Sequence, residues 1–393
     1  MNKKFTLILI ILIVYHCFFM ATVTVYAENN EGELINQNVI ELLDELNLTE
    51  LDEYLNENSN SILSNFGNSA KEIINYLING NLNVNYGNFL SELINVIFKD
   101  ATALLPIISQ IIAIVILAAV VNSVNGSVIS ETTTKIVKLI CYALILFTLS
   151  SLLTGIISNA LKSIQLIKKQ IEIIAPILIT LTVLTGGSGS AAIYQPSAVF
   201  LSSAVVDIIS GFVFPAIIGV IILNFMSQLN PELSFSGVSK LIKSIVKWVI
   251  GIVVAVFSIF LTVQSVTTSL FDGILFKATK YVVGSSVPIV GNFLSNGVDT
   301  FVSAGLLIKN SVGVCGLIIL LSEIIQPVIV LVAFSLLLKF VGAISQAIGE
   351  KSSHDIFFNL SSDIEYLLAG ILTIAFTYAL IVMLIINSAV TFI

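Results

Sequence analysis

The chain has 393 residues, of which 56% are hydrophobic and only 10% are charged, and its formal net charge is -7. Soluble domains carry about 25% charged residues, so this composition excludes an ordinary soluble protein and predicts an integral membrane protein. All 17 basic residues are lysine, which excludes sites that need a guanidinium fork to bind phosphate. Two histidines, His16 and His354, and three cysteines without CxxC spacing argue against a metal site, and we expect no cofactor.

Residues 1–27 have the pattern of a secretory signal peptide. Lys3 and Lys4 precede an apolar run over 5–20, and Ala27 provides a small residue at the expected cleavage site. The alternative is an uncleaved first transmembrane helix. We expect cleavage, because the chain that follows is hydrophilic, and cleavage would leave residues 28–100 outside the cytoplasm.

Residues 28–100 are acidic, with 13 Asp and Glu against only two basic residues, Lys71 and Lys99. Their apolar residues recur three and four apart, which predicts short amphipathic helices. Ser69 and Glu72 have the spacing of a helix-capping box. This region is either a small solvated cap on the bilayer surface or a surface for a partner protein, and its charge argues against binding to anionic lipid.

Residues 101–393 form the expected membrane domain. A hydrocarbon core about 30 Å thick needs about 20 apolar residues per helix. This criterion predicts seven spans, near residues 104–122, 137–158, 197–223, 245–266, 300–321, 326–348 and 367–392. A further apolar run at 171–185 is short, contains Pro176 and ends in a Gly-Gly-Ser-Gly-Ser run, so it is either an eighth, shortened span or a re-entrant hairpin. The fold class is an all-α polytopic bundle of seven or eight spans behind a small extracytoplasmic helical region.

The charges near the ends of the spans depend on that choice. With residues 28–100 outside, Lys135 and Lys138 fall inside, as the positive-inside rule asks. Lys240, Lys243 and Lys247 fall inside only if residues 171–185 do not cross. The count of lysines therefore favours the re-entrant version, in which this run does not cross the membrane.

Four charged residues lie within or beside the apolar segments. Asp207 interrupts the run AVVDIISGFVFP, and a carboxylate at membrane depth costs on the order of 3 kcal/mol and usually faces the bundle interior. It would line a pore or carry protons, or else it is a packing residue bonded to Ser203 or Ser210. Lys309, Glu323 and Lys339 raise the same question, and any Lys309–Glu323 pairing would have to be between helices.

The segment 280–316 combines an apolar composition with many Gly, Ser, Asn, Asp and Lys residues. Broken, polar membrane segments persist only where protein or a water-filled cavity surrounds them, and in polytopic proteins they point to a functional region. Residues 270–300, which overlap the start of this segment, predict an interfacial or re-entrant element, or a surface amphipathic helix. Our candidate functional residues are Lys280, Pro288, Gly291, Asp299 and Lys309, followed by Gln195, Pro196 and Asp207. Pro and Gly would shape the backbone, and Asp and Lys would pair between helices or line a pore.

Two stretches of this segment carry a family resemblance. KATKYVVGSSVPIVGNFLSNGVDT at 277–300 and LLIKNSVGVCGLI at 306–318 resemble the stage III sporulation protein AE family, with support from Gln195-Pro196, the leader and the Pro176–glycine region. The resemblance implies a non-enzymatic polytopic membrane protein. It would act in the mother cell, in the membrane around the engulfed forespore.

The same resemblance implies the partners. These are the other products of an eight-protein operon, including a secretion-type ATPase and ring-forming subunits, and the forespore protein called stage II sporulation protein Q. Together they would form a channel-like complex that sustains late forespore gene expression. Nucleic acid is not an expected partner.

A second hypothesis is an autonomous secondary transporter of a small solute, motivated by the broken helices and Asp207. An inverted repeat would favour it, and we find no convincing repeat between the two halves. A membrane-embedded enzyme is a third reading. It is weakened because no nucleophile–base pair is readable from the sequence.

Overall fold

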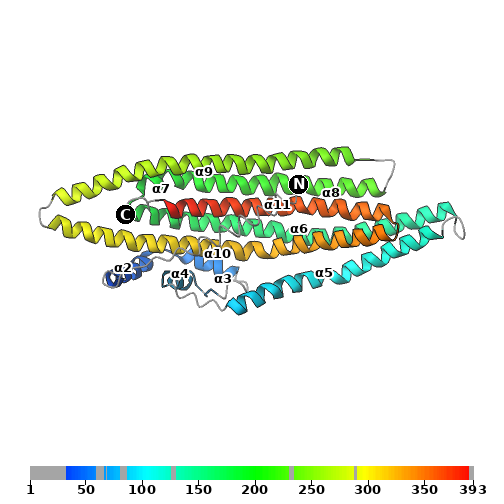
Figure 1. Cartoon of the computed structure of the whole chain (residues 1–393), viewed down its shortest axis with the longest axis horizontal. Helices are drawn as coiled ribbons and strands as arrows, with labels where there is room; N and C mark the ends of the chain where they lie inside the picture. The colour runs from blue at the N-terminus through cyan, green and yellow to red at the C-terminus, as the bar shows by residue number, and fades with distance from the viewer. Residues whose placement is uncertain are drawn as a thin grey trace.

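The computed structural model describes residues 32–58, 66–67, 69–79, 86–124, 130–229, 234–286 and 290–388. The expected signal peptide lies outside the described residues. In these ranges every regular element is a helix, which confirms the all-α class. Figure 1 shows an elongated bundle of antiparallel helices, with short N-terminal helices packed along one side.

The three short helices are α2 (Gly32–Glu45), α3 (Thr49–Glu57) and α4 (Ala70–Ile78). The bundle contains α5 (Tyr86–Ser123), α6 (Glu131–Leu184), α7 (Ser188–Ile208), a π-helical turn η2 (Ile209–Val213), α8 (Phe214–Leu229), α9 (Ser236–Ser286), α10 (Val290–Ala347) and α11 (Lys351–Asn387). The π turn comes just before Pro215, whose missing N–H and bulky ring disturb the regular helical bonding of the turn before it.

Six of the described helices are long and apolar enough to cross a membrane, fewer than the seven or eight predicted spans. The predicted segments 137–158 and 171–185 both belong to α6, which has 54 residues. Likewise 300–321 and 326–348 both belong to α10, which has 58 residues. At 1.5 Å per residue these helices are about 80 and 87 Å long, more than twice the hydrocarbon thickness. Pro176 and Pro327 lie inside them without ending either helix.

The end of α6 shows that residues 171–185 are not a re-entrant hairpin. Gly186 has φ 85°, which favours glycine, and the Gly187 N–H donates to the Thr182 carbonyl over 2.8 Å. This is the usual way for a helix to stop. The chain then returns through α7 and α8. Consequently the C-terminal ends of α5, α8 and α10 and the N-terminal ends of α6, α9 and α11 all lie at one end of the bundle, as Figure 1 shows at its right. The re-entrant version that the lysine count favours is therefore wrong, although the structure does place the starts of α6 and α9, with Lys135, Lys138, Lys240, Lys243 and Lys247, at the same end.

Helix α11 forms the core of the bundle. Leu367, Ile371, Tyr378 and Ile385 are all buried, as are most residues around its circumference. A helix that is apolar on every side is buried among other helices. Packing against α6, α8, α9 and α10 therefore accounts for the apolar composition of α11.

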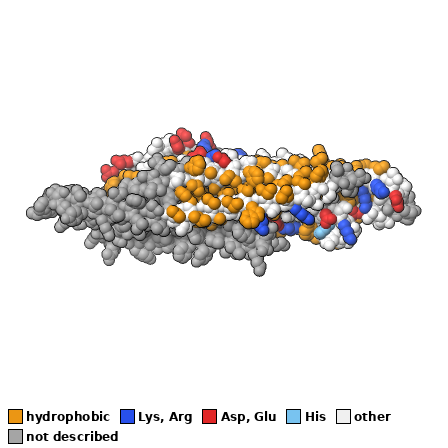
Figure 2. Space-filling view, turned by 90° about the horizontal axis from the view of Figure 1, so that it is seen from above, with side chains coloured by type: hydrophobic (Ala, Val, Ile, Leu, Met, Phe, Trp, Pro, Cys, Tyr) orange, Lys and Arg blue, Asp and Glu red, His pale blue; other side chains and the backbone are white. Residues whose placement is uncertain are grey.

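Helix α9, by contrast, exposes an apolar stripe with helical spacing. It includes Leu241, Ile245, Trp248, Ile252, Val256, Ile259 and Val263. Figure 2 shows a continuous apolar area on the corresponding face. Side chains of this kind suit contact with lipid.

Helix α6 changes surface character along its length. Its early exposed residues are apolar, among them Leu139, Leu144 and Phe147. Between residues 162 and 172 the exposed positions are instead polar (Lys162, Gln165, Lys169 and Glu172), and at the end of the helix Val183 and Leu184 are exposed. The stretch 136–147 of α6 therefore suits lipid, whereas the stretch 162–172, on the helix against which α3 packs, suits water.

Helices α2, α3 and α4 form a cap against the bundle, with α2 and α4 on α10 and α3 on α6. Buried residues of the cap include Leu51, Tyr54 and Ile73. The Ser69 hydroxyl accepts a bond from the Glu72 N–H over 3.2 Å, which confirms the helix start predicted there. An ion pair of 2.9 Å between Glu57 and Lys169 fixes α3 to α6.

Candidate functional site on the buried face of α10

The segment 280–316 is not a broken span. It contains the end of α9, the start of α10 and a connection at 287–289 that lies outside the described residues. The interfacial or re-entrant element expected over 270–300 is instead the continuation of these two helices. Lys280 lies in α9, Gly291 and Asp299 lie in α10, and Pro288 is outside the described residues. Gln195 and Pro196 lie in α7. The side-chain environments of these six residues are also outside what the structure describes.

Lys309 is the predicted residue whose surroundings are best defined. Its side chain is 0% exposed, and its ammonium donates to the carbonyl oxygen of Ser388, the C-cap residue of α11. The C-terminal end of a helix carries a partial negative charge, which stabilises a nearby cation. In this structure Lys309 therefore joins α10 to the end of α11.

Three glycines share the face of α10 that carries Lys309. A Cβ atom at Gly313 would lie 2.2 Å from Ile386 Cδ1 of α11, and one at Gly305 would lie 2.8 Å from Thr185 Cγ2 at the end of α6. A Cβ at Gly316 would lie 2.9 Å from Ile174 Cδ1. At these distances an added methyl group would have to displace the facing side chains, so the glycines allow α10 to approach both neighbours closely.

Gln170 of α6 joins the same face to α11. It is 0% exposed, and its Nε2 donates to the Gly316 carbonyl over 2.7 Å and to the Tyr378 hydroxyl over 2.9 Å. The close approach at Gly316 is what makes that carbonyl reachable. The result is a buried polar contact among α6, α10 and α11. We call Gln170, Lys309, Gly313, Gly316 and Tyr378 the α10 polar face.

A family model, stage III sporulation protein AE, matches residues 68–389. The chain belongs to this family. A relative with the same description from Bacillus subtilis (strain 168) is 25% identical over 334 residues, which is 84% of each chain. No solved structure matches the chain.

This membership confirms the family resemblance noted in the sequence. Together with the six apolar helices it makes the chain a multi-pass membrane protein involved in sporulation. The α10 polar face of this stage III sporulation protein AE homologue lies inside the matched residues. Helices α2 and α3 precede them.

Glu323, further along α10, faces the cap and not Lys309. The Tyr54 hydroxyl of α3 donates to the Leu166 carbonyl over 3.2 Å and also interacts with the Glu323 carboxyl group. Burial, followed by the nearby Glu323 charge, raises the pKa of Tyr54 well above its ordinary value. The Lys169 ammonium lies 5.9 Å from the centre of the Tyr54 ring. Tyr54 therefore anchors the cap between α6 and α10.

Asp207 does not face the bundle interior as expected. Its side chain is 62% exposed and forms an ion pair with Lys168 of α6 over 2.9 Å. Its partner comes from the polar stretch of α6, and is not Ser203 or Ser210 as the alternative had it. Lys339 is also paired, with Glu365 of α11.

Two polar clusters were missed in the sequence. Asp363 of α11 is 0% exposed, accepts a bond from Asn224 over 2.8 Å and pairs with Lys243. Glu350 accepts from the Tyr142 hydroxyl over 3.1 Å and pairs with Lys138 over 3.4 Å. One signal in the sequence could have identified Asp363: it lies four residues, about one helical turn, before the apolar run that starts at 367. If the helix begins well before that run, as α11 does, Asp363 lies within it.

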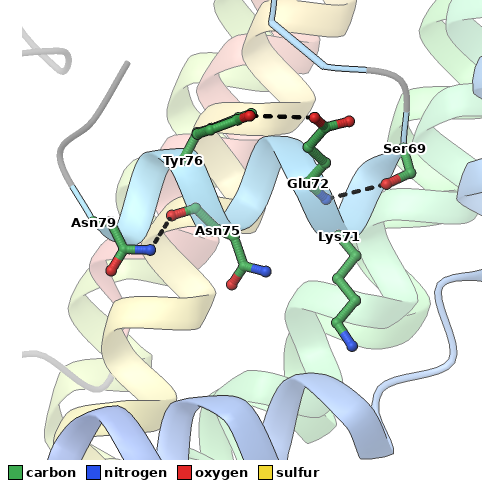
Figure 3. Close-up of a pocket in the computed structure, with 6 residues that line it drawn as sticks. All are labelled: Ser69, Lys71, Glu72, Asn75, Tyr76 and Asn79. Carbon is green, nitrogen blue, oxygen red and sulfur yellow. Dashed lines mark hydrogen bonds between the residues drawn. The ribbon is translucent and has the colours of Figure 1, made fainter. Parts of the chain in front are cut away.

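The cap carries a shallow groove of ≈ 470 Å3 along one face of α4. Figure 3 shows Tyr76, whose hydroxyl donates to Glu72 over 3.3 Å, and Asn79, which donates to the Asn75 carbonyl over 2.9 Å. Lys71 points across toward α2, where it pairs with Asp44. Each of these side chains already bonds within the cap, and they do not converge on a common ligand position. We therefore regard the groove as an ordinary surface feature.

The chemistry of all these groups is hydrogen bonding and ion pairing between helices. In the described ranges no three His, Cys, Asp or Glu residues are grouped as metal ligands would be. What the α10 polar face can do is hold α6, α10 and α11 in one register.

Proposed function

We propose that this chain is a non-enzymatic membrane component of a secretion-like channel complex that links mother cell and forespore. Its place would be the mother-cell-derived outer forespore membrane, and its activity would be needed for late forespore gene expression and spore development. The family match over residues 68–389 is the observation that carries the proposal. We infer non-enzymatic action because the polar groups described above pair with one another between helices.

The close packing of the bundle supports a role within a complex. The glycines of the α10 polar face bring α10 against α11 and α6 with no room for a Cβ atom. A path between these helices would require them to separate. Transport would therefore pass between this chain and other subunits, or between several copies of it.

The proposed partners are the other products of the stage III sporulation A operon, including an ATPase and ring-forming subunits, and the complex of stage II sporulation protein Q. With a cleaved signal peptide at 1–27, the acidic region 28–100 would face the space between the two membranes. Residues 101–393 would form the membrane domain, with α5 running across the boundary. The end of the bundle with Lys135, Lys138, Lys240 and Lys243 would then face the mother-cell cytoplasm, next to the ATPase.

The proposed functional residues fall in three places. Lys280 precedes the connection between α9 and α10, Pro288 belongs to it, and Gly291 and Asp299 follow it, where they would shape and pair the helix ends. Lys309 belongs to the α10 polar face. Gln195, Pro196 and Asp207 lie on α7, where Asp207 pairs with Lys168. The hypothesis of an autonomous transporter loses part of its support, because Asp207, one of the two features that motivated it, is exposed and paired with Lys168.

The test is deletion of the gene in its own host, with engulfed forespores followed by microscopy and a late forespore promoter reporter. We expect shrunken forespores and a silent reporter, both restored by the wild-type gene. A matched control is restoration by a Gly251→Ala variant, since nothing lies within 4 Å of a Cβ at that position. Normal forespores together with a growth or uptake defect would overturn the proposal and favour a transporter.

A further inference from the structure

The exposed face of α6 changes character between Phe147 and Ser151. From Ile136 to Phe147 its exposed residues are apolar, and the Phe147 side chain is 77% exposed. From Ser150 to Gln165, by contrast, every exposed residue of α6 is polar or glycine. Spacings of three and four residues place most of them on the same side of the helix as Phe147. We call the following residues the α6 polar stripe: Ser151, Thr154, Ser158, Asn159, Lys162 and Gln165.

The contacts of α6 with α11 fix the level of this stripe in the bundle. The Tyr142 hydroxyl donates to Glu350, which precedes the first residue of α11, and Gln170 donates to Tyr378, with the same separation of 208 residues in both pairs. Helices α6 and α11 therefore run side by side in the same direction. Each α6 residue lies level with the α11 residue 208 positions later.

Three other helices reach the level of the stripe through α11. Asp363, which this offset places level with Gly155, contacts Asn224 of α8 and Lys243 of α9. The α11 residue two positions before Asp363 bonds to Ser335 of α10 over 2.9 Å. The positions next to these contacts therefore show what surrounds the bundle at the depth of the stripe.

Helices α8, α9 and α10 all expose apolar side chains at this level. Ile222 is 53% exposed, Ile245 is 44% exposed and Leu336 is 59% exposed. On α8 the exposed apolar residues continue to both sides of the level, at Phe212 and Met226. All three helices are apolar enough to cross a membrane. The middle of the α6 polar stripe therefore lies at the depth of the hydrocarbon.

Helix α5 adds polar residues at the same depth. Its Asn122 accepts a bond from Lys138 over 2.8 Å, and the two helices run antiparallel from there. Ser109 and Gln110 of α5 consequently lie near the level of Ser151, and both are exposed. The side of the bundle formed by α5 and α6 is thus polar where α8, α9 and α10 are apolar.

Lipid cannot satisfy the side chains of this stripe. The Thr154 hydroxyl bonds to the Ser150 carbonyl over 2.9 Å, and a hydroxyl bonded in this way is tolerated in lipid. The Asn159 amide and the Lys162 ammonium carry more donors than one such bond can satisfy. Exposed groups of this kind are costly in hydrocarbon, so water or another protein must surround this face.

The continuation of the stripe favours water over a packed helix. Further along the same face α6 exposes Lys169 and Glu172, in the stretch next to the cap that suits water. The Lys168–Asp207 pair lies beside it, with the Asp207 side chain 62% exposed. Membrane helices pack closely on small residues, whereas long charged side chains extend their ends into water.

We propose that the α6 polar stripe faces a water-filled space that enters the membrane from the side of the cap and ends before Phe147. Its occupants would be water and small polar solutes, because hydroxyl and amide groups line its inner part. The proposal goes beyond the channel role above, which assigns transport to the boundary between subunits without naming a face of this chain. It does not depend on that role.

The test is cysteine accessibility in membranes from sporulating cells of the host, opened so that both sides are reachable. The full-length variants Ser151→Cys, Ser158→Cys and Gln165→Cys are treated with a membrane-impermeant methanethiosulfonate. Unreacted cysteines are then measured by a gel shift with a maleimide polymer. The wild type is the blank, since Cys141 is 2% exposed and Cys315 is 0% exposed.

We expect all three variants to react, because the reagent attacks the thiolate, which forms in contact with water. The matched controls are Phe147→Cys on the same face of α6, and Ile222→Cys and Leu336→Cys at the same depth on other helices. A thiol in hydrocarbon stays protonated, so these three should react more slowly by about tenfold or more.

Reaction of Gln165→Cys alone, or of none of the stripe variants, would overturn the proposal, because lipid or another helix would then cover the stripe at membrane depth. Equal rates at Ser158→Cys and at any of the three controls would also overturn it, since water would then not be confined to the stripe. The labelling requires no sporulation phenotype. A reactive stripe together with normal forespores in the deletion strain would therefore reject the channel role and keep this proposal.

Discussion

Lys309 of α10 donates a hydrogen bond from its buried ammonium to the carbonyl oxygen of Ser388, which caps the C-terminal end of α11. The two residues are 79 positions apart in the sequence. The partial negative charge at this helix end stabilises an ammonium that would otherwise be costly to bury. The contact therefore fixes the register of α10 against the core helix.

Lys309→Met is expected to destabilise the protein by about 1–3 kcal/mol, because the substitution leaves the buried carbonyl without a donor. Thermal unfolding in detergent measures the loss. Lys169→Met is the matched control, since its pair with Glu57 is exposed and such pairs contribute about 0–1 kcal/mol. Equal Tm values for the two variants would contradict the role assigned to Lys309.

Gly313→Ala is expected to destabilise by about 1–3 kcal/mol, because the new methyl group would overlap Ile386 and force the two helices apart. Gly219→Ala on α8 is the control. Nothing lies within 4 Å of a Cβ there, so alanine should stabilise by about 0.5–1 kcal/mol through its higher helix propensity. If both substitutions shift Tm in the same direction, close packing against Ile386 is not the reason that position 313 requires glycine.

The sequence predicted the helical class, the apolar segments and the capping residue Ser69, since these depend on local composition and spacing. It did not predict how many separate helices contain those segments. Hydropathy falls where α6 carries Lys162, Lys168 and Lys169, so the sequence predicts that a span ends before them. Ala, Leu, Lys and Gln in the same stretch are all good helix formers, so the helix continues while its surroundings change from lipid to water.

The two carboxylates Asp207 and Asp363 show that burial, too, could not be predicted from the sequence. Asp207 lies mid-way along an apolar run and was expected to be interior, yet it is exposed and paired with Lys168. Asp363 lies before an apolar run and was not singled out, yet it is buried at 0% exposure. Burial depends on which helices surround a residue. The arrangement of α11 at the centre of the bundle cannot be read from the period of one helix.

Tyr54→Phe is expected to loosen the cap by about 0.5–1.5 kcal/mol, because the hydroxyl bond to Leu166 is lost while the ring remains packed. The loosening is measured by hydrogen exchange of the α3 backbone amides, with the exchange of the α11 amides as the reference. Unchanged protection of α3 would show that the ring alone anchors the cap.

The pH dependence of the cap follows from the same residue. Burial raises the pKa of Tyr54 in the folded protein, so above the ordinary tyrosine pKa of about 10 the unfolded state loses a proton that the folded state keeps. Stability of the cap should therefore be full below pH 10 and fall as pH rises beyond it. Tyr54→Phe should remove this part of the decline. Limited proteolysis of both proteins between pH 8 and 11 compares them, and identical pH profiles would exclude Tyr54 as the cause.

Asp299→Ala and Pro288→Ala are expected to reduce sporulation without removing the protein from the membrane. Pro288 belongs to the connection between α9 and α10, and Asp299 lies in the early part of α10. The sequence carries its most specific family resemblance here, and we expect Pro288 to shape the connection and Asp299 to pair with a neighbouring helix. Spore counts and membrane immunoblots of complemented deletion strains measure the two effects separately. Ser244→Ala on the exposed side of α9 serves as the control and should sporulate normally. Wild-type spore counts in both Asp299→Ala and Pro288→Ala would show that this connection is not a functional region, and attention would then move to the α10 polar face.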